Sequence, residues 1–403
     1  TTADANTAVG YYALEVNTTG ANNVAVGKDA LQTNTTGANN TSVGARSLLA
    51  NTTGAELTAL GNHALHNNTT GDYNNATGVY ALYNNTTASN NTANGYRALF
   101  ANTTGFNNTA SGKGALYSNT TGSRNTSMGT DSLYANTTAN NSAAFGYNSL
   151  RYNTTGASNV AVGESALKAN TTASNNTAVG YQSLQANTTG AGNVAVGRQA
   201  LLVNTTAGSN TALGDQALNA NTTGGSNTAV GSAALASNTT GANNTAVGLN
   251  AMISNTTGTT NVGFGKDSLA SCTTGSGNTT LGYRAGEHST GVTSGSANVL
   301  LGAYCHSSSV TSDYATGIGY NINAAAGYTT IGESTTDIRA QHGVATWATV
   351  SDERYKKDIA SSTAGLSFIN DLTPRTWNYR TLGELPETFS AYEADSTKVF
   401  KNT

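Results

Sequence analysis

Residues whose types are suited to chemistry are few in this chain of 403 residues, of which only 10% are charged. His63 and His66 stand three residues apart, close enough in sequence for both imidazoles to approach one metal ion. Because no cysteine or carboxylate supports the pair, we expect polar surface residues there and no metal site. Cys272 and Cys305 are the two cysteines. Two cysteines in a chain of this length give no disulfide framework, so we expect free thiols.

Two recurring features are suited to carbohydrate. Each Asn-Thr-Thr is formally an acceptor for N-glycosylation, but a turn needs the same residues for its hydrogen bonds, and we expect that role to dominate. Tyrosine rings can stack on sugars, although tyrosines at variable positions are more often simply exposed. The tyrosines at such positions are Tyr11, Tyr12, Tyr80, Tyr96, Tyr147 and Tyr181. No pair of carboxylates recurs, so the pattern does not indicate a glycosidase.

The composition changes at residue 351, where a run of ionisable residues begins. It reads SDERYKKDIASSTAGLSFINDLTPRTWNYR. Its apolar residues Ile359, Leu366, Ile369 and Leu372 have helical spacing. On these patterns alone, Asp352 caps a helix whose polar face is ERYKK. The change predicts a separate segment over residues 351–403.

Most of the chain before that point is a repeat, first visible in NTAVGYYALEVNTTGANNVAVGKDAL. Its glycine recurs every 17 residues with no insertion or deletion. The glycines are Gly10, Gly27, Gly44, Gly61, Gly78, Gly95, Gly112, Gly129, Gly146, Gly163, Gly180, Gly197, Gly214, Gly231, Gly248, Gly265 and Gly282. A strict period indicates that each copy is one rung of a stacked structure, in which like residues lie above like.

Seventeen residues are too few for a helical hairpin and suit two short strands and two turns per rung. We place the first strand at NTAVG, the second around ALxxN, and a turn at NTTGxN. The sequence therefore predicts an all-β fold, a parallel β-solenoid or β-roll of 17-residue repeats over residues 1–286. An irregular β continuation is expected over residues 287–350, where NVLLG, ATGIG and TTIG repeat the motif.

Variation between copies indicates which positions face the core. From Leu14 to Leu269 the residue four after each glycine is Leu, with Met252 as the one substitute, and the residue before it is Ala or Ser. We place both inside, together with the small residue two before the glycine; in the first rung these are Leu14, Ala13 and Ala8.

The residues one and three before the glycine, mostly Val and Thr, share the opposite face of the first strand. One Leu per 17 residues makes a thin core, so we expect this Val/Thr face to meet partner chains around a three-fold axis. Thr77, Asn94 and Ser111 would form a polar stretch there. A single-chain core would penalise a buried Asn that lacks a partner.

Composition also argues against several function classes. The net charge is −3 and no basic patch indicates nucleic-acid binding. No run of about 20 apolar residues indicates membrane insertion. The GxG patterns lack the strand–turn–helix context of a phosphate-binding loop, and we expect no cofactor. The chain begins at Thr1 without a signal peptide, so we expect a processed chain or a piece of a longer one.

The repeat resembles the SVAIGxxA/S repeat of YadA-like trimeric adhesin heads, which are left-handed parallel β-rolls of shorter period. The segment after residue 350 resembles the start of the peptidase S74 intramolecular chaperone domain, which ends phage tail fibres and tailspikes. That family begins SDxRLKxxI and continues with a helix and an LxPVxFxW/Y strand, which implies a small α+β segment here. The matching residues are Ser351, Asp352, Arg354, Lys356, Ile359, Leu372, Pro374, Trp377 and Tyr379. Tyr355 stands where the family usually has Leu.

In the S74 family, the domain trimerises the fibre and then releases itself by autoproteolysis. The resemblance implies that Ser351 is the nucleophile and Lys356 its base, with Asp352 and Arg354 positioning the loop. A serine attacks once a base takes its proton, and lysine serves when burial lowers its pKa. The family domain usually runs on beyond the length found here, including a GxIAQEV-like helix, which leaves self-cleavage of this chain open.

Together the resemblances imply the shaft of a homotrimeric phage tail fibre or tailspike, located in the virion and extracellular. Its partners would be copies of itself, other virion tail proteins, and a host glycan or protein receptor. A bacterial trimeric adhesin at the cell surface and a polysaccharide-degrading tailspike are the alternatives. We expect no activity on an external substrate, and self-cleavage near Ser351 is the one reaction implied.

Overall fold

The computed structural model describes residues 3–287, 292–334, 336–344 and 347–349. The chain divides between residues 350 and 351 into two compact units, and the fold below is that of the first. The α+β segment expected over residues 351–403 lies outside the described residues.

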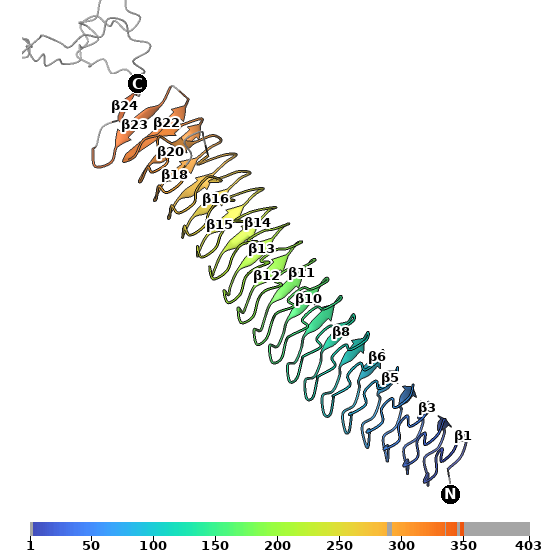
Figure 1. Ribbon diagram of the computed structural model, residues 1–403. Helices are drawn as coiled ribbons and strands as arrows, with labels where there is room; N and C mark the ends of the chain where they lie inside the picture. Colours follow the sequence, from blue (N-terminus) through green and yellow to red (C-terminus); the bar gives the residue numbers. More distant parts are fainter. Residues whose placement is uncertain (1–2, 288–291, 335, 345–346, 350–403) are drawn as a thin grey trace, which may run out of the picture. The chain divides into compact units, whose positions relative to one another are not determined.

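Each 17-residue repeat contributes one three-residue strand, and successive strands pair in parallel (Figure 1). The register is one residue on its equivalent in the next repeat, as in Thr7↔Val24 and Val9↔Val26. The strands are β1 Thr7–Val9, β2 Val24–Val26, β3 Thr41–Val43, β4 Thr58–Leu60, β5 Asn75–Thr77, β6 Thr92–Asn94, β7 Thr109–Ser111, β8 Thr126–Met128, β9 Ala143–Phe145, β10 Val160–Val162, β11 Thr177–Val179, β12 Val194–Val196, β13 Thr211–Leu213, β14 Thr228–Val230, β15 Thr245–Val247, β16 Val262–Phe264 and β17 Thr279–Leu281. This confirms the predicted all-β parallel solenoid, which has about 19 rungs.

The second strand predicted around ALxxN is wrong. In the rung of Gly27, Asp29 and Leu31 have φ of 56° and 49° on either side of Ala30, and the same two positions are left-handed in almost every rung. A strand needs negative φ throughout, so the segment forms consecutive turns instead. Its backbone still bonds to the next rung: the amide of Leu31 donates to Ser47 O at 3.1 Å, and that of Thr33 to Leu49 O at 3.2 Å.

The core is the thin column that the sequence predicts. Leu31 and its equivalents are fully buried, as are the alanines or serines before them and those two before each repeat glycine. The first rung departs from this: Ala8 is exposed, and Ala13 and Leu14 are only partly buried. Strand β1 pairs with β2, so a neighbouring rung covers only one side of this first rung.

Two buried asparagine columns supply the rest of the interior, and sequence reasoning assigned both of them to turns and strand ends. The first asparagine column lies seven residues after each glycine. In it, Asn34 Nδ2 donates to Asn17 Oδ1 in the preceding rung at 2.8 Å and to Gly37 O at 2.9 Å. Asn51 Nδ2 in turn donates to Asn34 Oδ1 at 2.8 Å. Each amide thus has partners above and below, which is what burial of a polar group requires.

The second asparagine column lies four residues before each glycine. Asn23 Nδ2 donates to Gly37 O at 2.9 Å, while its Oδ1 accepts the backbone N–H of Asn40 at 2.9 Å. The pattern continues along the solenoid except at Leu57 and Ser142, which replace the asparagine. Together, the two columns fix the rung-to-rung spacing with directional bonds where apolar side chains are few.

The repeat glycine is required by both backbone conformation and space. Gly180 has φ of 130°, and a Cβ there would lie 2.5 Å from the carbonyl oxygen of Gly197 in the next rung. No side chain fits that gap, and L-residues rarely adopt that conformation. The same contact recurs along the column, which explains why this letter of the repeat never varies before Gly282.

Beyond residue 286 the sheet continues with irregular spacing. Strand β18 (Val299–Leu301) pairs in parallel with β17, and β20 (Thr316–Tyr320) and β22 (Tyr328–Glu333) follow in order, carrying the NVLLG, ATGIG and TTIG motifs. Strands β23 (Ile338–Gln341) and β24 (Trp347–Thr349) then pair antiparallel. A small second sheet joins β19 (His306–Ser307) to β21 (Asn323–Ala324).

Candidate functional site

The residues that the S74 resemblance implies for self-cleavage, Ser351, Asp352, Arg354 and Lys356, lie outside the described residues. Their geometry is therefore not part of the site described below. The candidate site of the solenoid is built from three columns, defined by their distance after the repeat glycine. The first column follows the glycine directly, the second column lies two residues after it, and the fifth column lies five residues after it.

The fifth column carries a continuous aromatic stack, which we call the aromatic ladder: His66, Tyr83, Phe100, Tyr117 and Tyr134. From Tyr83 to Tyr134 the ring centroids lie 4.9–5.3 Å apart and the planes differ by 2–6°. The in-register rungs impose this spacing, which suits offset stacking. All five side chains are half-buried, so part of each ring faces solvent.

The N-terminal end of the ladder broadens into a cluster with the second column. The His63 and His66 rings stack at 5.2 Å, and His63 also stacks on Tyr80 at 5.1 Å. Burial lowers the pKa of His63, and the charges of His66 and Arg46 lower it further. The two histidines are thus half-buried ring partners rather than the exposed residues that we expected. The described residues contain no group of three metal-binding side chains.

Cations lie against the rings at several rungs. The guanidinium of Arg97 lies 5.7 Å from the Tyr80 centroid, 5.1 Å from that of Tyr96 and 5.6 Å from that of Phe100. Arg151 lies 5.9 Å from the Tyr134 ring at the far end of the ladder. Such contacts contribute on the order of 0.5–1 kcal/mol at exposed sites and more where the cation is desolvated.

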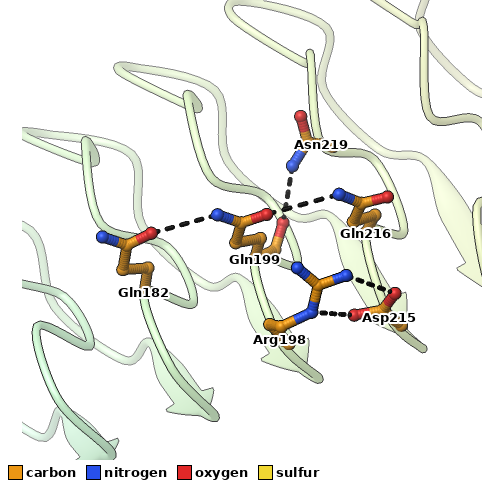
Figure 2. Close-up of polar contacts among 6 residues, drawn as sticks. All are labelled: Gln182, Arg198, Gln199, Asp215, Gln216 and Asn219. Carbon is orange, nitrogen blue, oxygen red and sulfur yellow. Dashed lines mark hydrogen bonds and ion pairs between the residues drawn. The ribbon is translucent and has the colours of Figure 1, made fainter.

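Further along the solenoid, the same columns carry a purely polar ladder (Figure 2). Gln199 Nε2 donates to Gln182 Oε1 at 3.1 Å, and Gln216 Nε2 donates to Gln199 Oε1 at 3.3 Å. Beside them, Arg198 forms two hydrogen bonds with Asp215 at 2.8 and 2.9 Å, and this bonding raises the pKa of Arg198. The same columns thus carry stacked aromatic rings in one part of the solenoid and hydrogen-bonded amide and charged side chains in another.

The outer face of the sheet, one and three residues before each glycine, is open in the single chain. Many of its apolar residues are exposed, for example Leu213 (47%), Phe264 (43%) and Leu281 (54%), and others are half-buried. Asn94, in the polar stretch with Thr77 and Ser111, is also exposed. This face therefore lies outside the chain's own core, and its burial against partner chains stays a prediction.

The tyrosine prediction is partly confirmed. Five of the six are exposed, and Tyr80 is half-buried in the cluster with His63 and Arg97. The ladder itself was missed, although Tyr83, Phe100, Tyr117 and Tyr134 stand 17 residues apart. The period that identified the leucine column would have identified this one too.

Both cysteines are free, as predicted, and both are buried. Burial raises the pKa of Cys272 to about 11 and that of Cys305 to about 12. Cys272 occupies the first asparagine column, where its Sγ donates to Gly275 O at 3.6 Å. Asn255 Oδ1 in the preceding rung is consequently left without a hydrogen-bond partner among the described residues.

Comparison with known families gives one match. Residues 351–396 match the family model Peptidase_S74, chaperone of endosialidase. No curated protein and no solved structure matches the chain. The match and the solenoid of 17-residue repeats fit a tail-fibre or tailspike-like protein, and the chaperone family implies trimer formation. In the part of the chain that the structure describes, no helix has the length and apolar character needed to cross a membrane.

Proposed function

We propose that three copies of this chain form the shaft of a phage tail fibre or tailspike that attaches the virion to its host. The observation that carries the proposal is the S74 match at residues 351–396, which follows directly on a long solenoid. A shaft supplies length and rigidity, and three chains present every surface feature three times. Multivalency then turns weak contacts with a host receptor into firm attachment.

The trimer forms through the outer face of the sheet. Support comes from the exposed apolar side chains one residue before the glycine, which recur on both sides of the polar stretch, for example Leu60 before it and Leu213 and Phe264 after it. Apolar patches of that extent are rare on soluble monomers and are typical of interfaces. A second copy with the same repeat spacing can match such a column rung for rung.

The S74-like segment serves this assembly as an intramolecular chaperone. In the proposal, it brings three chains together and then separates from the shaft by cleavage near Ser351. Ser351 Oγ attacks the carbonyl carbon of Val350, and the Lys356 amine accepts the hydroxyl proton. The peptide C–N bond then breaks, the proton passes from Lys356 to the released Ser351 amine, and water hydrolyses the ester left on Ser351 Oγ. Asp352 and Arg354 position the loop that carries the serine.

Expression of the full chain beside Ser351→Ala tests the cleavage. We expect mass spectrometry to find a cut near residue 351 in the wild type and an intact Ser351→Ala chain. If both chains stay intact, the self-cleavage is refuted. The proposed trimer is tested separately, by counting the chains in each particle.

A further inference from the structure

A hollow of about 230 Å³ lies next to the aromatic ladder, on the surface formed by the first, second and fifth columns. It arises at Gly114, since this glycine occupies the second column between Arg97 and Asp131, where neighbouring rungs carry long or polar side chains. A Cβ at Gly114 would lie 2.7 Å from Asp131 Oδ1 and 3.4 Å from the Tyr134 ring. The missing side chain therefore opens the space.

The groups around this hollow are mostly cationic and phenolic. It is lined by Tyr96, Arg97, Lys113, Gly114, Tyr117, Asp131, Tyr134 and Arg151. Three cations and one carboxylate make a positive site in a chain whose net charge is −3. A local excess of this sign selects an anionic ligand.

The positive charge at this place is only partly compensated. Asp131 forms an ion pair with Arg151 at 3.5 Å, but no carboxylate of the described residues lies within ion-pair distance of Arg97 or Lys113. The Nε atoms of Arg97 and Arg151 are buried and have no hydrogen-bond partner within the described part of the chain. An anion in the hollow would pair with the guanidinium and ammonium groups that line it through charge-assisted hydrogen bonds.

The same rungs differ from the rest of the shaft on a second face. Thr77, Asn94 and Ser111 replace the apolar residues of the sheet face in the rungs of Gly78, Gly95 and Gly112. The ladder lies in these rungs and their immediate neighbours, and the hollow extends from the rung of Gly95 to that of Gly146. Two independent departures from the repeat thus mark one part of the shaft.

We propose that the hollow at Gly114 binds one acidic sugar unit of a surface polysaccharide. The carboxylate of the sugar pairs with Arg97, Lys113 and Arg151, and its hydroxyls bond to the tyrosine hydroxyls and to Asp131. The hollow is smaller than the roughly 300–1,000 Å³ of a drug-sized pocket, so it takes a single unit while the polymer continues along the shaft. This inference deepens the proposed attachment function and rests on it for its biological meaning.

Binding of the full chain to oligogalacturonate tests the site, with maltoheptaose as the neutral probe and polyglutamate as the charge-matched peptide. Lys113→Gln removes an exposed cation at the rim, and Lys28→Gln is its control in the first column of another rung. Gly114→Gln fills the hollow. Gln182, Gln199 and Gln216 adopt φ of 55–57° in the second column, so this position of the repeat accepts glutamine.

We expect calorimetry to show that oligogalacturonate binds and maltoheptaose does not. Lys113→Gln should weaken binding about five- to tenfold, Gly114→Gln should abolish it, and Lys28→Gln should leave it unchanged. Equal binding of polyglutamate, or unchanged binding by Gly114→Gln, would overturn the acidic-sugar site. A monomeric chain that binds the sugar refutes the trimeric shaft alone, and a trimer that does not bind it refutes this site alone.

Discussion

At the scale of single residues, the repeat glycine shows how strictly a rung is defined. Gly180 and Gly192 both have positive φ, of 130° and 70°, but only Gly180 faces a carbonyl of the next rung. A Cβ on Gly192 would meet nothing within 4 Å. The two positions therefore separate the cost of steric overlap from that of backbone conformation.

We predict that Gly180→Ala lowers the free energy of unfolding by about 3 kcal/mol, because it adds overlap to conformational strain. Gly192→Ala should cost about 1 kcal/mol, from the left-handed conformation alone. Urea unfolding followed by circular dichroism measures both. Equal losses would show that close approach of the rungs does not select this glycine.

The two thiols make a second residue-scale prediction. Burial raises the pKa of Cys272 to about 11 and that of Cys305 to about 12, above the reference value of 9.0. The thiolate is the reactive form, so the native protein should resist iodoacetamide at pH 8 and react fully once unfolded. Labelling of the native protein at the denatured rate would contradict the burial.

The same shifts fix the sign of a pH effect. Both pKa values are raised in the folded state, so this contribution to stability is complete below pH 9. It is lost as the pH rises toward 11 for Cys272 and toward 12 for Cys305, because the unfolded chain ionises first. Replacing both cysteines by alanine should make unfolding less sensitive to pH between 9 and 11.

At the scale of elements, the asparagine columns give the thin core its rung-to-rung order. Asn170 Nδ2 donates to Asn153 Oδ1 at 2.7 Å and to Ala173 O at 3.0 Å, and Asn170 Oδ1 accepts from Asn187 Nδ2 at 3.0 Å. Removing this amide leaves buried polar groups unpaired on both sides. Each such group costs about 1–3 kcal/mol.

We predict that Asn170→Ala destabilises the solenoid by about 3 kcal/mol, whereas Thr172→Ala, at an exposed position two residues on, changes stability by less than about 0.5 kcal/mol. Thermal unfolding of the two variants compares them directly. A loss of similar size in both would show that the column contributes no more than any turn residue.

The strict period was sufficient to predict the parallel stack, the leucine column and the small residues beside it. It failed at the segment ALxxN, because nothing in the letters of Asp29 and Leu31 signals left-handed φ for a buried leucine. Asn34 was assigned to a turn because asparagine is common in turns, and its burial depends on stacked neighbours that no single repeat contains. The hollow at Gly114 exists because Arg97 and Asp131 lie beside it in the adjacent rungs. The sequence around Gly114 alone therefore does not predict it.

At the scale of the whole molecule, the proposed trimer makes the outer sheet face sensitive to charge. Leu213 on that face and Leu249 in the first column are both exposed in the single chain, at 47% and 44%. They lie on different faces of the solenoid. The same substitution at both positions therefore compares the proposed interface with a surface outside it.

We predict that Leu213→Glu lowers the temperature at which the particle dissociates, because three buried glutamates would face one another without partners. Leu249→Glu should leave that temperature unchanged. Light scattering during heating follows dissociation. If both variants behave as the wild type, the chains do not meet through this sheet face.

The central claim is that the solenoid works as a trimer. Analytical ultracentrifugation of the full-length chain, combined with mass spectrometry of its constituent polypeptides, counts the chains in each particle. The account predicts three chains per particle across the accessible concentration range. A particle of one chain, stable at high concentration, would contradict it.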